Sequence, residues 1–196
     1  MQPELSAQSK WIFENYHYWG QPNATTIVPV ISFETKSNLH AELRYNYEEI
    51  QTVSLFGGRA FHAGNTFKIS VTPLAGISLG KFQGISGGVN ADLNWKGLYL
   101  SSQSQYSRTT IKEAKSFFFT WSEMGYTIKN KFFGGVALQY TLADKVKEMS
   151  HGFLAGINFK NVSIPFYVFN PSRKNMYFVA GFNYELQLKK KPGAGN

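Results

Sequence analysis

The 196-residue chain contains no cysteine, and it has few charged residues. The absence of cysteine excludes a disulfide framework and a metal site built on thiolates. Aspartate, glutamate, lysine and arginine make up 16% of the residues, against about 25% in soluble domains. No apolar run approaches the roughly 18 residues that a membrane helix needs, and no secretory signal is visible. The sequence therefore predicts neither a disulfide-stapled fold nor a helical membrane protein.

Sequence signatures of catalytic, nucleotide-binding and nucleic-acid-binding sites are also missing. There is no phosphate-binding loop or dinucleotide fingerprint. The net charge is +8, but the basic residues are not gathered in a nucleic-acid-binding motif. His151 follows Ser150, and His40 lies two residues before Glu42, yet neither histidine has the third polar group that a nucleophilic triad needs. We assign no catalytic residue, no metal site, no cofactor and no nucleic-acid partner.

What the sequence does contain is aromatic residues, glycine and a strict alternation of polarity. Aromatics make up 16% of the chain, and there are 18 glycines. In a strand, successive side chains face opposite sides of the sheet. Between Asn38 and Glu49, one parity holds Leu39, Ala41, Leu43, Tyr45 and Tyr47, and the other holds His40, Glu42, Arg44, Asn46 and Glu48. This segment predicts a strand with one apolar face and one charged face.

Similar segments of about ten residues recur along the chain. Short turns near residues 36, 63, 96, 130 and 160 alternate with longer connections near residues 49, 81, 112, 147 and 172. This alternation is typical of an up-and-down meander with tight turns on one rim and loops on the other. The expected strands are residues 11–19, 27–34, 38–49, 52–58, 67–79, 85–95, 98–108, 116–128, 132–143, 152–159, 162–170 and 176–188.

The pattern predicts one all-β domain over residues 1–196, with flexible termini at 1–8 and 189–196. Twelve strands are expected, and ten is the alternative because residues 11–19 and the Glu48-Glu49 connection have weak patterns. Pro29, Pro73 and Pro165 fall inside expected strands, where each removes a ladder hydrogen bond and predicts a bulge. Three glycine pairs predict either extra space or local kinks. They are Gly57-Gly58, Gly87-Gly88 and Gly134-Gly135.

A twelve-stranded antiparallel sheet with one apolar face can fold over as a sandwich, or it can close with that face turned to lipid. Aromatic girdles at two membrane interfaces explain why aromatics recur near the strand ends. A charge in hydrocarbon costs several kcal/mol, so the polar parity must then face a lumen. The sequence therefore favours a closed transmembrane β-barrel. The aromatics are Tyr45, Tyr47, Phe67, Trp95, Tyr126, Phe132, Tyr140, Phe153, Phe159 and Tyr184.

On these features the chain resembles the bacterial outer-membrane β-barrels. The resemblance rests on the alternating repeats, on the turns and loops, and on the aromatic-rich ending FNYELQL. The closing KKKPGAGN departs from it, because many members of that class end on an aromatic residue. The resemblance implies an integral outer-membrane location after removal of a signal peptide, contact with membrane lipids, and a small porin-like barrel.

Two groups of residues are candidates for function. Charged residues on the polar parity either line a charge-selective constriction or form a hydrogen-bonded interior: His40, Glu42, Arg44, Glu48, Lys68, Asp92, Arg108, Glu123 and Glu185. Basic residues at the tight turns either anchor the barrel at the lipid surface or steer anionic solutes: Lys36, Lys96, Lys129, Lys131, Lys160 and Lys189.

The leading functional hypothesis is a narrow porin-like channel for small, preferably anionic, solutes. The second is a non-conducting barrel that serves as a structural or docking subunit of a larger outer-membrane assembly. An outer-membrane hydrolase is a minor alternative, because such barrels include lipases and proteases.

Overall fold

The computed structural model describes residues 9–20 and 26–188. The expected flexible termini, and with them Lys189, lie outside the described residues. No helix in these two ranges is long or apolar enough to span a membrane. The strands are β1 (Lys10–Trp19), β2 (Thr26–Glu34), β3 (Leu39–Tyr45), β4 (Thr52–Arg59), β5 (Phe61–Ala63), β6 (Phe67–Gly80), β7 (Gly84–Trp95), β8 (Leu98–Thr109), β9 (Phe117–Ile128), β10 (Phe132–Ala143), β11 (Val146–Phe159), β12 (Val162–Phe169) and β13 (Tyr177–Gln187).

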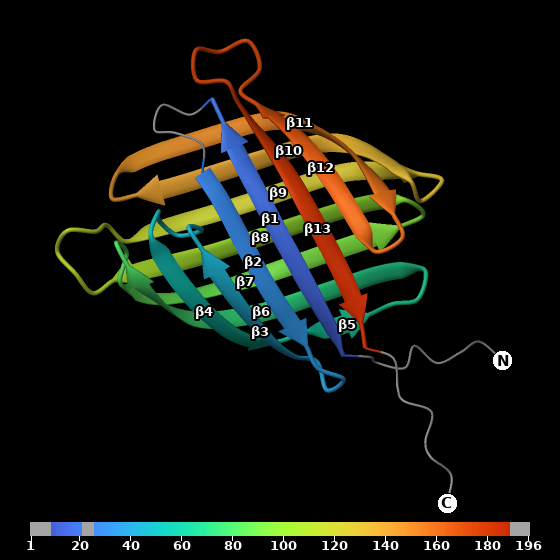
Figure 1. Ribbon diagram of the computed structural model, residues 1–196, viewed down its shortest axis with the longest axis horizontal. Helices are drawn as coiled ribbons and strands as arrows, with labels where there is room; N and C mark the ends of the chain where they lie inside the picture. The colour runs from blue at the N-terminus through green and yellow to red at the C-terminus, as the bar shows by residue number, and fades with distance from the viewer. Residues whose placement is uncertain (1–8, 21–25, 189–196) are drawn as a thin grey trace, which may run out of the picture.

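All the strands belong to one antiparallel sheet that closes on itself (Figure 1). Neighbours in sequence are neighbours in the sheet, β1 pairs with β13, and β4 pairs with β6 to complete the ring. β4 and β5 act as one strand, because both pair with β6 in a single register that runs from Gly58 opposite Leu74 to Phe61 opposite Val71. The expected closed barrel of twelve strands is therefore confirmed.

The prolines interrupt hydrogen bonding without producing the expected bulges. The β1–β2 register is unchanged on both sides of Pro29. The ladder lapses opposite Pro73, between β4 and β5, and opposite Pro165, between β12 and β13, and both ladders resume in the same register. The prediction of bulges was wrong, because the lost N–H donor removes one bond and adds no residue to the strand.

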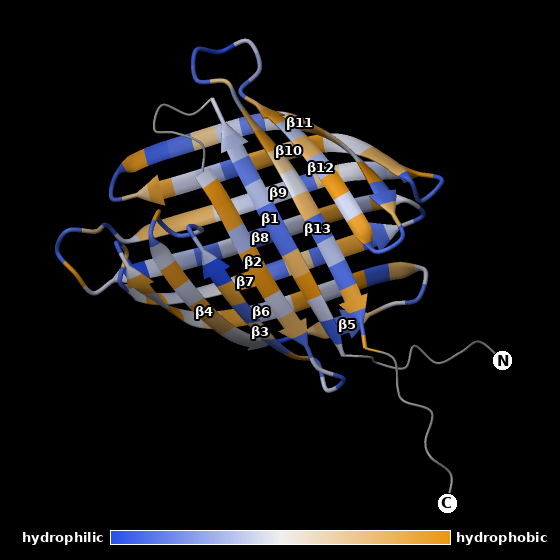
Figure 2. Ribbon diagram, in the orientation of Figure 1, coloured by the Kyte–Doolittle hydropathy of each residue, from blue (hydrophilic) through white to orange (hydrophobic). Residues whose placement is uncertain are grey.

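The apolar parity of the strands faces outward, as the alternation predicts. On β3, Leu39 and Leu43 are 55% and 45% exposed, while Arg44 between the outward positions is 2% exposed. Figure 2 shows apolar and polar residues alternating along the strands. A sandwich in water would bury the leucines and expose the arginine. This inverted arrangement fits a barrel whose outer wall meets hydrocarbon and whose polar groups face inward.

Hydroxyl groups interrupt the apolar outer wall on β8 and β9. Ser102 and Ser104 share the outward parity of the exposed Leu100. Their hydroxyls pair with the next strand, at 2.9 Å between Ser102 Oγ and Ser122 Oγ and 2.8 Å between Ser104 Oγ and Thr120 Oγ1. Each hydroxyl thus has a partner within the protein, which lowers the cost of placing it against lipid.

The glycine pairs serve close packing. In two of the pairs, the outward member, Gly57 or Gly87, has open space where a Cβ would lie. The inward members are crowded, since a Cβ on Gly58 would lie 2.2 Å from the Pro73 carbonyl oxygen and one on Gly135 would lie 2.1 Å from that of Met124. Glycine at these inward positions lets neighbouring backbone approach.

The turns follow the predicted alternation with two exceptions. The connection between β6 and β7 was expected to be one of the longer ones, but it spans only residues 81–83, no more than the turn over residues 64–66. β10 and β11 are joined by only Asp144 and Lys145, with Asp144 at a φ of 54°. A longer loop to Ser150 was expected, and this was wrong. The polar residues Lys147 and Glu148 belong to β11, which begins at Val146 and so extends beyond the apolar segment 152–159 that was expected.

Candidate functional site

An ion-pair cluster centred on Arg44 occupies one side of the lumen. The Arg44 guanidinium donates from Nε to Glu42 Oε1 at 2.6 Å, and from Nη1 to Gln105 Oε1 at 2.6 Å and to Glu48 Oε1 at 3.4 Å. It lies between two aromatic rings, 4.4 Å from the centroid of Tyr47 and 4.2 Å from that of Phe56. Since every side of the cation is occupied, Arg44 is a structural centre rather than a free charge.

The connection between β3 and β4 folds into the lumen. Asn46 has a φ of 59°, which ends the extended strand after Tyr45. The Tyr47 hydroxyl then donates to Gln103 Oε1 on β8 at 2.7 Å, and Glu48 accepts a short hydrogen bond from Ser54. Tyr47 was expected on the lipid face, and this was wrong, because the left-handed residue Asn46 breaks the alternation that the prediction assumed.

Aromatic side chains fill the opposite side of the lumen. Trp121 of β9 lies at the centre, with ring centroids 5.2 Å from Tyr167 and 5.7 Å from Phe169. Glu123 Oε1 accepts two hydrogen bonds there, from Trp121 Nε1 at 2.6 Å and from the Tyr167 hydroxyl at 2.7 Å. Phe169 stacks on Tyr177 at 4.9 Å. These side chains narrow the lumen to the space between them and the Arg44 cluster.

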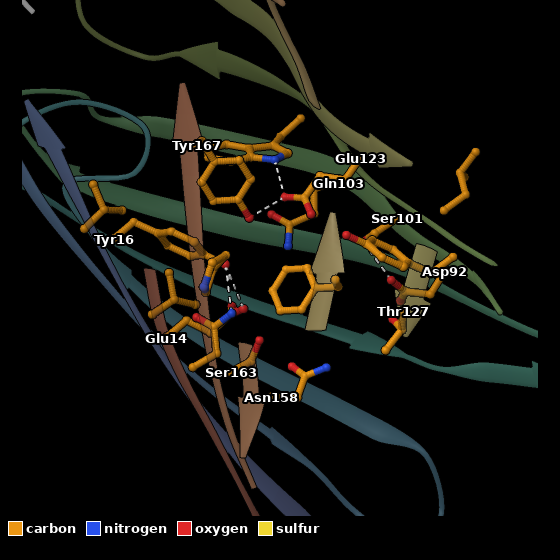
Figure 3. A pocket seen from close by; sticks show the side chains of 18 of the residues that line it. Glu14, Tyr16, Asp92, Ser101, Gln103, Glu123, Thr127, Asn158, Ser163 and Tyr167 are labelled. Atoms are coloured by element: carbon orange, nitrogen blue, oxygen red, sulfur yellow. Dashed lines mark hydrogen bonds between the residues drawn. The ribbon is translucent and has the colours of Figure 1, made fainter. Parts of the chain in front are cut away.

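A cavity of about 340 Å³ remains between the two clusters (Figure 3). Carboxylates enter it from four strands: Glu14, Glu42, Asp92 and Glu123. Amides and hydroxyls also line it, and Figure 3 shows Gln103, Ser101 and Asn158 among them. Among the described residues that line this cavity, none is lysine or arginine.

Two further cavities adjoin the central one. A recess of about 670 Å³ near the tight-turn rim shares Asn158, Ser163 and Asn183 with the central cavity. A vestibule of about 790 Å³ near the loop rim shares Tyr47 with it. The inward-folded Tyr47 thus separates the vestibule from the central cavity.

The structure places the candidate lumen residues at different depths. Glu42, Glu48 and His40 gather at the Arg44 cluster, with His40 Nε2 at 3.3 Å from Glu42 Oε2. Asp92 and Glu123 line the central cavity, and Glu185 lines the recess near the tight-turn rim. Lys68 lies directly opposite Asn94 on the inward face. It is exposed, and like Glu185 it lies at the tight-turn rim.

Arg108 does not face the lumen. It lies opposite the outward Ile85 and next to Ser107, which is fully buried on the inner side. The prediction that Arg108 lines the lumen was therefore wrong. β8 carries polar residues on both parities, so polarity alone could not identify its inner face.

Sequence reasoning missed Glu14, Tyr16 and Trp121, which all line the central cavity. On β1 the aromatic residues occupy both parities, and Asn15 and His17 face outward with Trp11 and Trp19. The signal that could have identified Glu14 is its acidic side chain inside an otherwise aromatic strand.

The rim lysines lie over aromatic rings of the outer wall. The Nζ atoms of Lys96, Lys131 and Lys160 lie 5.4, 5.3 and 5.5 Å from the ring centroids of their chain neighbours. Those rings belong to Trp95, Phe132 and Phe159, all outward and exposed. Lys129 lies in the same turn as Lys131, Lys36 lies in the turn between β2 and β3, and both are exposed. This placement is typical of side chains that anchor a barrel at the lipid surface.

No three histidine or acidic side chains of the described residues come together as a metal site. His151 faces outward opposite Leu138, away from the lumen.

No protein-family model and no curated protein matches the sequence. Solved structures do match. The KdgM porin aligns over 88% of this chain and 98% of its own, with 14% identity and a TM-score of 0.65. The fold is that of the outer-membrane porins. The NanC porin aligns over 91% of this chain and all of its own, with 11% identity and a TM-score of 0.61. The KdgM porin in complex with disordered oligogalacturonate aligns with the same coverage and identity as the KdgM porin alone, and with the same TM-score of 0.65.

Proposed function

We propose that this chain is a narrow, porin-like passage for small polar solutes across a bacterial outer membrane. The observation that carries the proposal is the row of three adjoining cavities in the lumen, from the tight-turn recess to the loop vestibule. A barrel with a purely structural role has no need of polar space along its axis. The shared fold of the KdgM and NanC porins supports the same function.

Tyr47 limits the width of the proposed passage. It stands where the vestibule meets the central cavity, held by its hydrogen bond to Gln103 and by the Arg44 guanidinium against its ring. Solutes must pass this side chain or displace it. The passage is therefore expected to conduct weakly.

The sign of the charge on the preferred solute is a separate property of the passage. Lysines at the tight turns raise the local concentration of anions, and the KdgM porin is known in complex with oligogalacturonate. Both support the anionic preference that the sequence predicts. The central cavity carries the opposite charge, and rings of acidic side chains in a pore favour cations.

Single-channel recording in planar bilayers tests the proposal. The wild-type protein should give small, steady conductance steps, and Tyr47→Ala should give larger ones. Tyr45→Ala is the matched control, because Tyr45 is 42% exposed on the outer wall and should leave conductance unchanged. Protein that inserts reproducibly but stays silent, in both the wild type and Tyr47→Ala, would overturn the proposal and favour a structural or docking subunit.

A further inference from the structure

We infer that the lumen selects cations, so that the solutes it passes are small cations with N–H donors, such as ammonium and guanidinium compounds. This inference rests on the proposed channel function, and it opposes the anionic preference expected from the rim lysines. It is carried by the central cavity and by the positions of the basic residues around it.

The charge that solutes meet in the central cavity is negative. Glu14 of β1, Glu42 of β3, Asp92 of β7 and Glu123 of β9 enter it from separate parts of the ring. None of the described residues in its lining carries a positive charge at neutral pH. Rings of acidic side chains are the usual basis of cation selectivity in pores.

Arg44 does not neutralise this charge. Its side chain is 2% exposed and is covered by the Tyr47 and Phe56 rings. Its charge is already met by Glu42 and Glu48, so the cluster of one cation and two carboxylates has a net charge of −1. The cluster adds to the negative potential of the lumen.

The remaining carboxylates are held by neutral donors. Glu123 accepts from Trp121 and Tyr167, Asp92 accepts from the Ser101 hydroxyl at 2.8 Å, and Glu14 accepts from the Tyr16 hydroxyl at 3.3 Å. Hydrogen bonds from neutral donors favour the charged form of a carboxylate.

Two buried polar atoms of the same lining have no partner within the protein. They are Asn183 Oδ1 and the Tyr99 hydroxyl oxygen. Both atoms can accept a hydrogen bond, and a buried acceptor without a donor is costly. Asn183 Oδ1 can only accept a hydrogen bond, so a solute with an N–H donor matches this part of the wall and an anion does not.

The aromatic walls favour the same class of solute. The rings of Tyr16, Phe133 and Trp121 line the cavity with the carboxylates. The face of an aromatic ring attracts cations, most strongly where water is displaced.

Two of the rim lysines act outside the lumen: Lys96 and Lys131 lie over rings on the lipid-facing wall. Lys160 borders the tight-turn recess, and Lys68 faces inward opposite Asn94 at the same rim, but neither lines the central cavity. Salt screens charges at the rim over a distance of about 10 Å. The interior carboxylates are closer to the path of a solute.

The reversal potential across a KCl gradient tests the inference. The wild-type channel should be several-fold more permeable to K⁺ than to Cl⁻. The triple variant Glu14→Gln, Asp92→Asn, Glu123→Gln should lose most of that ratio, whereas Asp144→Asn, an exposed acid in the turn between β10 and β11, should keep it. An anion-selective or unselective wild-type channel would overturn the inference and leave the channel function intact.

A second measurement works even with a silent barrel. The part of the tryptophan fluorescence that Trp121→Phe removes should be quenched more by the cation N-methylpyridinium than by iodide. The triple variant should reduce that difference. Equal quenching, or stronger quenching by iodide, would count against cation selection whether or not the protein conducts.

Discussion

Arg44 on β3 donates a 2.6 Å hydrogen bond to Gln105 on β8, across a lumen around which β4, β6 and β7 separate the two strands. The bond ties two distant parts of the ring together. It also holds a fully enclosed cation between two carboxylates, so the stability of the barrel depends on this side chain.

Replacing Arg44 with methionine should destabilise the barrel by about 3–5 kcal/mol, because Glu42 and Glu48 are left buried without a cation. Urea titration of the protein folded in lipid vesicles measures the effect. The triple variant Arg44→Met, Glu42→Gln, Glu48→Gln should recover a large part of the loss. If the single variant were as stable as the wild type, the cluster could not have the structural role assigned to it.

The outer wall should not tolerate a charge near its middle. Leu55 faces outward between Leu43 and Ile77 and is 54% exposed. Leu55→Arg should cost about 2–4 kcal/mol in a bilayer. Gln83→Arg, in the exposed connection between β6 and β7, serves as the control. A harmless Leu55→Arg would show that this face meets water.

A methyl group should destabilise the barrel at one glycine and leave its stability unchanged at another. Gly135→Ala should destabilise the barrel by about 1–3 kcal/mol, because its Cβ would lie 2.1 Å from the Met124 carbonyl oxygen and 2.5 Å from the Gly125 Cα. Gly87→Ala should stay within about 0.5 kcal/mol of the wild type, because its Cβ has open space. Equal effects in urea titration would mean that β9 and β10 can separate without cost.

The rim lysines should stabilise the barrel only where the lipid is anionic. The triple variant Lys96→Gln, Lys131→Gln, Lys160→Gln should lose about 1–3 kcal/mol in vesicles that contain phosphatidylglycerol, since each basic residue near an anionic surface contributes about 1 kcal/mol. In phosphatidylcholine alone the loss should be much smaller. A loss that is the same in both lipids would point to the cation–π contacts instead.

The barrel could be predicted because most strands keep their polarity on a fixed parity. On β3 and β6 the outward positions are almost all apolar, so the apolar set of alternate residues identifies the lipid-facing side of the strand. The order of the strands also follows, since an up-and-down meander leaves few choices once the tight turns are located.

The lumen was harder to predict, because its contents depend on exceptions to that rule. Tyr47 reaches Gln103 only because Asn46 is left-handed, and parity carries no information about such a residue. Glu14 is hidden in β1, where Tyr16 and Tyr18 face inward while Trp11 and Phe13 face outward. Which side chains meet across the ring depends on barrel closure, which a single strand pattern does not reveal.

The pairing of β1 with β13 joins residues from opposite ends of the chain, with Lys10 opposite Gln187 and Trp19 opposite Phe178. The seam therefore cannot form until the final strand has been synthesised. Until then the backbone of β1 lacks its partner strand, and the apolar outward side chains are not yet part of a closed barrel. The chain should consequently depend on holdase chaperones to keep it soluble and unfolded on its way to the membrane.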